Sequence, residues 1–204
     1  VNLPGIISEA AVYSVLAAIA VGISQEIDLL TAIKALGDFH APKGRLNILT
    51  GGQDTILLDD SYNASPTAVA AALDILGRWP APSARQRVAV LGDMLELGVD
   101  GPAEHRRIGQ IVAQLPIGHL VLVGSLAEMI GQEARERGWA GQIDYFADSI
   151  AAADKIREII PERAVVLLKG SQGSRIERIT KALLLDPTAA ASQLVRQDGR
   201  WLDS

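Results

Sequence analysis

One stretch decides how this chain folds: Ile56-Leu57-Leu58-Asp59-Asp60-Ser61-Tyr62-Asn63-Ala64-Ser65-Pro66. An apolar run ends in two carboxylates, small and polar turn residues follow, and Pro66 opens an alanine-rich segment. The pattern predicts a strand, a polar turn and the start of a helix. Ligands of open α/β sheets bind beyond the carboxyl ends of the strands, so Asp59, Asp60 and Asn63 are candidate site residues. The alternative is local: Asp60 ends the strand and Ser65 caps the helix.

Downstream of this stretch, strand and helix patterns alternate. Strands are predicted at 87–91, 119–123, 143–146 and 164–169, and helices at 66–77, 102–114, 125–137, 149–159 and 173–185. Strands that are apolar throughout are buried on both faces, which is typical of a parallel sheet between two helix layers. The sequence therefore predicts an α/β fold with a mostly parallel sheet, helices on both faces and right-handed crossovers.

Upstream of the stretch, a further strand is expected at residues 46–50, and Gly51-Gly52 suggests that it forms a hairpin with the strand at 55–59. Residues 1–41 have the apolar spacing of two helices, one capped near Gly22 and one from about 25 to 36. Two helices cannot bury both apolar faces alone, so they need a partner in this chain or upstream of it. Ala41-Pro42-Lys43-Gly44 has turn chemistry and is a candidate linker.

Two further segments carry turn signals. Asp198-Gly199 predicts a small hairpin over residues 193–202. Residues 80–83 contain two prolines and are expected to form a surface loop.

Composition restricts the function classes. The 204 residues are 49% hydrophobic but only 4% aromatic, so a sizeable core must consist of Ala, Val, Ile and Leu. A net charge of −5 without a basic block argues against nucleic-acid binding. The lack of cysteine excludes disulfides and Cys-ligated metals, and no apolar run is long enough to span a bilayer. The chain starts at Val1 rather than Met, which is compatible with a fragment or a processed product.

Four polar clusters follow predicted strands and should share one edge of the sheet. They are residues 59–63, 92–98, 124–125 and 169–175. The last is the best candidate for an anion site, because its glycines let the backbone approach a ligand and Lys169 and Arg175 supply charge. The helix expected to follow would add free N–H groups. The alternative is a glycine-rich turn with solvated basic side chains.

The remaining polar residues give weaker signals. A Walker loop is absent, so nothing in this chain could by itself grip a nucleoside triphosphate. Asp59 and Asp60 suit a ribose or a metal-bound water. Asp93 and Glu96 form a second acidic pair, for which turn and helix capping is the favoured interpretation. His105 follows on a predicted helix, but the histidines have no paired metal spacing, and no Ser-His-Asp arrangement can be inferred.

Three of these clusters together resemble the C-terminal region of the Mur ligases. The matching segments are Asp59-Asp60-Ser61-Tyr62-Asn63-Ala64-Ser65-Pro66, Leu91-Gly92-Asp93-Met94-Leu95-Glu96-Leu97-Gly98 with His105 beyond it, and Lys169-Gly170-Ser171-Gln172-Gly173-Ser174-Arg175. They occur in the family's order and approximate spacing, over nearly all of the chain. The resemblance implies a Rossmann-like C-terminal domain at 42–204, preceded by helices at 1–41 that end a central ATPase domain. The Walker loop and the modified lysine that holds Mg²⁺ would lie upstream.

The resemblance implies ATP-dependent amide formation in peptidoglycan precursor synthesis, carried out in the cytoplasm by a monomer. In the branch that the motifs resemble most, ATP phosphorylates the carboxylate of UDP-MurNAc-tripeptide and the amine of D-Ala-D-Ala attacks the acyl phosphate. Mg²⁺ neutralises charge during phosphoryl transfer. This chain alone is expected to hold no catalytic residue or metal ligand and to be inactive. The alternatives are another Mur-type amino-acid ligase and a non-catalytic α/β binding module.

The resemblance also implies roles for residues on the nucleotide side. Arg45 resembles the arginine that reaches the ATP phosphates, Asp60 resembles the aspartate that holds the ribose, and Asn63 lies in the same loop. The family usually carries a histidine and an asparagine that help hold the adenine, and Ala10 and Ser14 stand at those positions here.

On the other side of the reaction, Lys169, Ser171 and Arg175 resemble residues of the loop that faces the incoming amino-acid substrate. Their role is implied by the resemblance and not by the spacing of the residues.

Overall fold

The computed structural model describes residues 7–80 and 85–202, so the loop expected at 80–83 lies, apart from Pro80, outside the described residues. The chain divides into two compact units, one ending at Pro42 and the other beginning at Lys43. In the described part of the chain, no helix has the length and apolar character needed to cross a membrane.

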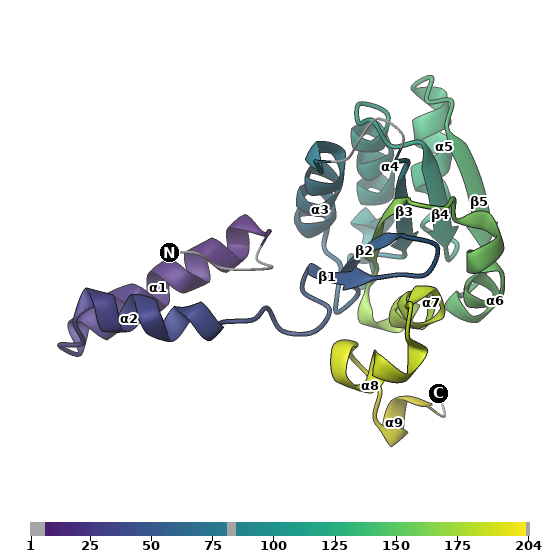
Figure 1. Ribbon diagram of the computed structural model, residues 1–204. Coiled ribbons are helices and arrows are strands. Elements are labelled where there is room, and N and C mark those ends of the chain that lie inside the picture. The colour runs from purple at the N-terminus through teal and green to yellow at the C-terminus, as the bar shows by residue number, and fades with distance from the viewer. Residues whose placement is uncertain (1–6, 81–84, 203–204) are drawn as a thin grey trace. The chain divides into compact units, whose positions relative to one another are not determined.

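The first unit contains helices α1 (Glu9–Ser24) and α2 (Leu29–Ala35), which pack against each other, and a short 3-10 helix, Leu36–Asp38 (Figure 1). The cap predicted at Gly22 is wrong, because α1 continues to Ser24. The second helix also starts later than expected. Glu26 has a left-handed φ of 61° that interrupts the helical path, and Asp28 then caps α2 by accepting hydrogen bonds from the backbone of Leu30 and Thr31.

The second unit is built on a sheet of strands β1 (Asn47–Thr50), β2 (Ile56–Asp60), β3 (Arg87–Gly92), β4 (His119–Val123), β5 (Gln142–Phe146) and β6 (Val165–Lys169). Their order is β1-β2-β6-β3-β4-β5. The β1–β2 pair is antiparallel and every other pair is parallel, which confirms the predicted hairpin and the mostly parallel sheet.

Helices cover both faces of this sheet: α3 (Pro66–Arg78), α4 (Gly101–Val112), α5 (Glu128–Glu136), α6 (Ser149–Ile159) and α7 (Glu177–Leu183). The connections through α3, α4 and α5 advance across the sheet in one direction, and the connection through α6 returns. Right-handed crossovers therefore place the first three helices on one face and α6, with α7 beside it, on the other (Figure 1).

The core lies between the sheet and these helices, and it is almost entirely aliphatic. On the α6–α7 face, alternate residues of the strands, such as Val88, Val90 and Val166, pack with Ile156 and Ile179. The intervening strand residues are equally buried against the other helix layer. The fully apolar strands thus indicated a two-sided core correctly.

Two predicted elements differ from the structure. The helix expected from residue 173 begins at Glu177, because Arg175 has a left-handed φ of 53° after a 3-10 helix at Gln172–Ser174. The hairpin expected at 193–202 is wrong, because that region contains the short helices α8 (Ala190–Gln193) and α9 (Gly199–Leu202). The carbonyl of Asp198 accepts the amide of Trp201 at 3.0 Å, so Asp198-Gly199 opens a helical turn instead of a hairpin.

Strand β6 comes last in the sequence but lies between β2 and β3. The chain leaves β2 and β3 toward one face of the sheet and leaves β6 toward the other. Ligands of open α/β sheets bind at such a topological switch point, at the carboxyl ends of the strands.

Candidate functional site

The switch point joins the first and fourth polar clusters through an ion pair. Asp60 and Lys169 end their strands directly opposite each other, and the Lys169 Nζ donates to the Asp60 Oδ2 at 2.6 Å. The same Nζ donates to the carbonyl oxygen of Asn63 at 2.9 Å. Only 2% of the Lys169 side chain and 13% of the Asp60 side chain are exposed. Lys169 therefore holds both ends of the loop that follows β2.

The electrostatics of this pair follow from its partial burial. Burial raises the pKa of the Asp60 carboxyl above its ordinary value, while the positive charges of Lys169 and Arg45 act in the opposite direction. The backbone N–H of Leu46 also donates to this carboxylate. Carboxylate oxygens have several acceptor positions, so Asp60 can still accept hydrogen bonds from a ligand's hydroxyl groups.

The segment Gly44-Arg45-Leu46 crosses over the end of β2. The carbonyl of Gly44 accepts the amide of Tyr62 at 3.1 Å, and the exposed Arg45 guanidinium stacks on the Tyr62 ring, 4.1 Å from its centroid. A Cβ at Gly44 would lie 2.9 Å from the Tyr62 nitrogen, and the φ of 68° also favours glycine. The segment thus places the positive charge of Arg45 near enough to Asp60 to act on its carboxyl. The expected contact of Arg45 with ATP phosphates stays a prediction.

Ser171 joins the second cluster to the first and fourth. Its hydroxyl accepts the Leu95 amide at 2.8 Å and donates to the Ala64 carbonyl at 3.3 Å, and its own amide donates to the Asp93 carbonyl at 3.1 Å. Only 4% of Ser171 is exposed. Its side chain therefore connects the loops that follow β2, β3 and β6.

Asp93 of the second cluster connects the loop after β3 to the third cluster, residues 124–125, and to the start of α5. The Asp93 Oδ1 accepts the amide of Ala127 at 2.7 Å, immediately before α5. A Cβ at Gly124, where φ is 102°, would lie 2.5 Å from that carboxylate. Asp93 thus has the capping role favoured from the sequence, whereas Glu96 lies in an exposed turn with a φ of 65°.

The Asp59 side chain does not lie with the polar clusters at the carboxyl ends of the strands. Its side chain is fully buried, and its Oδ1 accepts the Thr180 hydroxyl of α7 at 3.0 Å. Burial raises the pKa of Asp59 to about 6, against the opposing effect of the Ser61 and Thr180 side chains. The expectation that Asp59 could bind a ribose or a metal-bound water is therefore wrong, because the side chain faces the interior.

The histidines in the second unit serve the structure. His105 is buried, its Nδ1 lies 2.7 Å from the Gly101 carbonyl oxygen, and its Nε2 accepts the Met94 amide at 2.9 Å, so it holds the loop after β3. His119 is buried with its Nε2 2.6 Å from Asp144. Within residues 7–80 and 85–202, no group of three or more His, Cys, Asp or Glu side chains is arranged to hold a metal ion.

A buried ion-pair cluster at the start of α7 was missed from the sequence. Glu177 is fully buried, with its Oε1 2.7 Å from the Arg175 Nε and its Oε2 3.0 Å from Nη2 of Arg196. Arg196 also donates to the carbonyls of Ser61 and Tyr62, at 2.5 Å and 3.1 Å. The helix start that supported the predicted anion site therefore already holds an internal carboxylate. Arg196 lies 135 residues beyond Ser61, and no local motif marks the contact.

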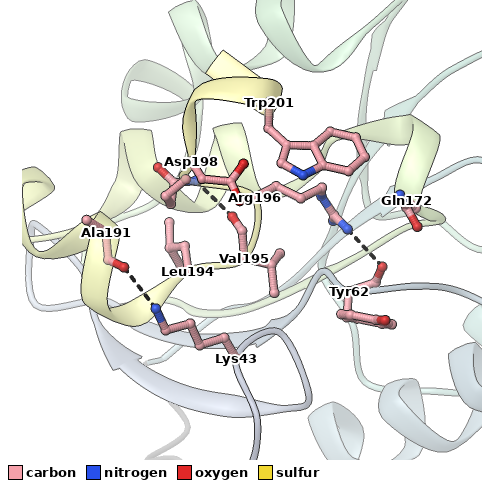
Figure 2. A pocket seen from close by; sticks show the side chains of 10 residues that line it. Lys43, Tyr62, Gln172, Ala191, Leu194, Val195, Arg196, Asp198 and Trp201 are labelled. Carbon is pink, nitrogen blue, oxygen red and sulfur yellow. Dashed lines mark hydrogen bonds between the residues drawn. The ribbon is translucent and has the colours of Figure 1, made fainter. Parts of the chain in front are cut away.

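A cavity of about 480 Å³ lies between Tyr62 of the first cluster and the C-terminal segment, residues 186–202. Figure 2 shows Lys43 and Tyr62 on one side of it and Arg196 and Trp201 on the other, with Gln172 at its edge. Lys43 donates to the Ala191 carbonyl at 2.8 Å, so the segment before β1 is bound directly to the C-terminal segment.

Comparisons with known proteins agree with this arrangement. A family profile described as "Mur ligase, glutamate ligase domain" matches residues 44–172, starting one residue after the first residue of the second compact unit. The UDP-N-acetylmuramoyl-tripeptide–D-alanyl-D-alanine ligase of Escherichia coli (strain K12) is 34% identical over 157 residues, covering 76% of this chain and 32% of the relative. The chain thus spans about a third of the length of the curated relatives it matches.

Solved structures give the same result. A crystal structure of MurF from Acinetobacter baumannii superposes with a TM-score of 0.75 and 29% identity, over 88% of this chain and 38% of that one. The MurF ligase of Thermotoga maritima in complex with ADP superposes with a TM-score of 0.59 over 85% of this chain and 37% of that one; at 23% identity, this likeness concerns the fold alone.

The profile covers more than half of the chain, and its span includes the Asp60 loop, the Asp93 loop and the start of the loop after β6. The same loops meet at the switch point of a Rossmann-like sheet. On this evidence the chain belongs to the Mur ligase family.

Proposed function

We propose that this chain is the C-terminal portion of an ATP-dependent ligase that joins D-Ala-D-Ala to UDP-MurNAc-tripeptide during peptidoglycan precursor synthesis. The names of the Escherichia coli and Acinetobacter baumannii relatives support the reaction. The observation that carries the proposal is the pair of Asp60 and Lys169 at the switch point, with Arg45 stacked beside it on Tyr62. We also propose that the enzyme works as a monomer in the cytoplasm, where UDP-linked precursors are made.

We propose that residues 1–41 complete a central ATPase domain and that residues 42–204 form the C-terminal domain. Support comes from the many exposed apolar side chains of the first unit, among them Tyr13, Leu16 and Leu30 at 70%, 55% and 70% exposure. Many exposed apolar side chains gathered on one small unit are typical of a surface that another segment or protein covers. The match covers 32% of the length of the Escherichia coli relative, so a full-length protein of that size would contain further segments that could cover these side chains.

The reaction would proceed in two steps. The peptide carboxylate attacks the γ-phosphorus of ATP, the bond to the bridging oxygen breaks, and ADP leaves. The amine of D-Ala-D-Ala then attacks the acyl carbon, the carbon–oxygen bond to phosphate breaks, and the amine nitrogen loses a proton as the amide forms. Mg²⁺, held upstream of this chain, would supply charge neutralisation during phosphoryl transfer.

On the nucleotide side, the proposed contacts suit the groups present. The carboxylate of Asp60 would accept hydrogen bonds from the ribose hydroxyls, and the planar guanidinium of Arg45 would bind phosphate oxygens. Asn63 lies in the same loop with an exposed side chain. These residues would bind an ATP molecule that the upstream domain also binds. Closure of the two domains would then bring the reactants together.

On the substrate side, we propose that the loop from Lys169 to Arg175 faces the incoming amine. The cations of Lys169 and Arg175 are paired with Asp60 and Glu177, so they shape the loop from within. Gln172 is exposed at the loop tip and is available for direct contact.

The test is turnover by the full-length protein. Phosphate release should require ATP, UDP-MurNAc-tripeptide and D-Ala-D-Ala together, and D-Ala-D-Ala should be preferred over any single amino acid. A preference for a single amino acid would instead indicate another Mur-type ligase. An absence of ATP turnover with every combination would favour a non-catalytic binding module. The 204-residue chain alone should release no phosphate.

A further inference from the structure

We infer that Arg196 is a positioning residue for the nucleotide-side loop, because it connects the C-terminal segment at residues 186–202 to the backbone carbonyls of Ser61 and Tyr62. The inference rests on the proposed roles of Arg45 and Asp60 in binding ATP. It connects the last described segment of the chain with a proposed ATP site whose Ser61 lies 135 residues earlier in the sequence than Arg196.

The Arg196 guanidinium serves three acceptors at once. Nη2 donates to the Ser61 carbonyl and to the Glu177 Oε2, and Nη1 donates to the Tyr62 carbonyl. The side chain is 6% exposed, and the backbone has a left-handed φ of 54°. A non-glycine residue adopts that conformation at a cost, so surrounding contacts must maintain it. The planar fork of five donors is what allows one side chain to bridge acceptors on separate segments.

The two carbonyls lie between the two points of the loop that Lys169 binds. Asp60 before them and the Asn63 carbonyl after them are fixed by Lys169. Between these points, Tyr62 carries Arg45 on its ring and binds the Gly44 carbonyl through its amide. A shift of the Tyr62 backbone would therefore displace Arg45 before it displaced Asp60.

The C-terminal segment is itself anchored, so Arg196 has a rigid base. Arg175 donates through Nη2 to the Trp201 carbonyl at 2.6 Å, and Lys43 donates to the Ala191 carbonyl. Glu177 binds both arginines through its single carboxylate, which offsets one of their two positive charges. In Figure 2 the dashed contact from Arg196 to Tyr62 closes one side of the cavity between the two segments.

The first test measures the loop itself in the 204-residue chain. Arg196→Lys keeps a positive charge opposite Glu177 but removes the fork that reaches both carbonyls. Hydrogen exchange at the amides of Tyr62 and Ala64 should accelerate by about tenfold or more, while exchange in the loop after β3 stays unchanged. The control is Arg137→Lys, because Arg137 is 56% exposed and pairs with Glu133 on α5. Unchanged exchange at Tyr62 in Arg196→Lys would overturn the inference.

The second test uses the full-length enzyme. Arg196→Lys should raise KM for ATP about tenfold, with kcat changed less than about threefold and KM for D-Ala-D-Ala unaltered. A purely structural defect would lower the thermal midpoint and reduce kcat for all substrates together, and that result would contradict a positioning role. Arg137→Lys should behave as the parent enzyme.

A parallel variant separates this inference from the proposed function. If Asp60→Asn also leaves KM for ATP unchanged, the nucleotide role of the loop is wrong and the failure belongs to the proposed function. If Asp60→Asn raises KM while Arg196→Lys does not, the loop binds ATP and Arg196 does not position it.

Discussion

Two adjacent aspartates show how position separates chemically identical residues. Successive side chains of a strand point to opposite faces of the sheet. Asp60 ends β2 at the edge and pairs with Lys169, whereas Asp59 points into the interior and pairs with Thr180. In the sequence they are one acidic pair, but only the Asp60 side chain is partly exposed, at 13% against 0% for Asp59.

The role of Asp60 can be tested in the full-length enzyme. Asp60→Ala should raise KM for ATP about tenfold or more, because a carboxylate that accepts ribose hydroxyls is lost. Asp60→Asn should raise it less, since one acceptor oxygen remains and Lys169 keeps a partner. Steady-state kinetics at varied ATP measure both variants, with the Asp74→Ala variant on α3 as control because Asp74 is 47% exposed. An unchanged KM would count against the proposed role.

Because the pKa of the buried Asp59 carboxyl is raised, we expect the free energy of unfolding to depend on pH. Burial raises its pKa from 3.8 to about 6. The folded chain therefore binds more protons than the unfolded chain, so this group's contribution to stability is full below pH 3.8 and is lost as the pH rises through about 6. The loss amounts to about 3 kcal/mol.

Asp59→Asn is uncharged at every pH and can still accept from Thr180. Its free energy of unfolding should therefore decline less than that of the parent chain between about pH 4 and pH 8. Urea unfolding at both values measures the difference, and Asp74→Asn is the exposed control. Equal declines in the parent and Asp59→Asn would show that the buried group does not titrate in this range.

At the scale of elements, most strands and helices were predicted within one to three residues, because their apolar spacing and end residues are local signals. Ser65 accepts the Ala68 amide and Pro66 begins α3, as the alternative local interpretation required. Two of the failures, at 173–176 and 193–202, lie beside the ion pairs of Glu177 with Arg175 and Arg196, which no sequence pattern indicated. Arg175 leaves the helical conformation there, and its guanidinium binds Glu177.

The start of α7 should be sensitive to the charge of Glu177. Glu177→Gln leaves Arg175 and Arg196 buried without a counter-charge, so we expect the free energy of unfolding to fall by about 3 kcal/mol. Urea unfolding provides the measurement. Glu128→Gln, in the exposed first turn of α5, should change it by less than about 0.5 kcal/mol. A loss as small as the control's would mean that the cluster contributes little to stability.

At the scale of the whole molecule, the first unit differs from the second in how little it buries. Among the described side chains of α1, Val15 is buried, and α2 has none buried. We expect backbone amides of α1 and α2 to exchange at least about tenfold more slowly in the full-length protein than in the 204-residue chain. Amides of β3 and β6 should exchange equally in both. Equal exchange in α1 and α2 would contradict a covering upstream domain.

The sequence by itself determined the α/β class, the hairpin, most element boundaries and the motifs of the Mur ligase family. These features depend on periodicity, turn residues and short motifs within a few neighbouring positions. Only the tertiary structure decided that Asp60 pairs with Lys169, that Asp59 is buried, and that Arg196 reaches the loop at Ser61. Strand order and charge pairing across more than 100 residues depend on which surfaces can be buried together, and no local pattern encodes that choice.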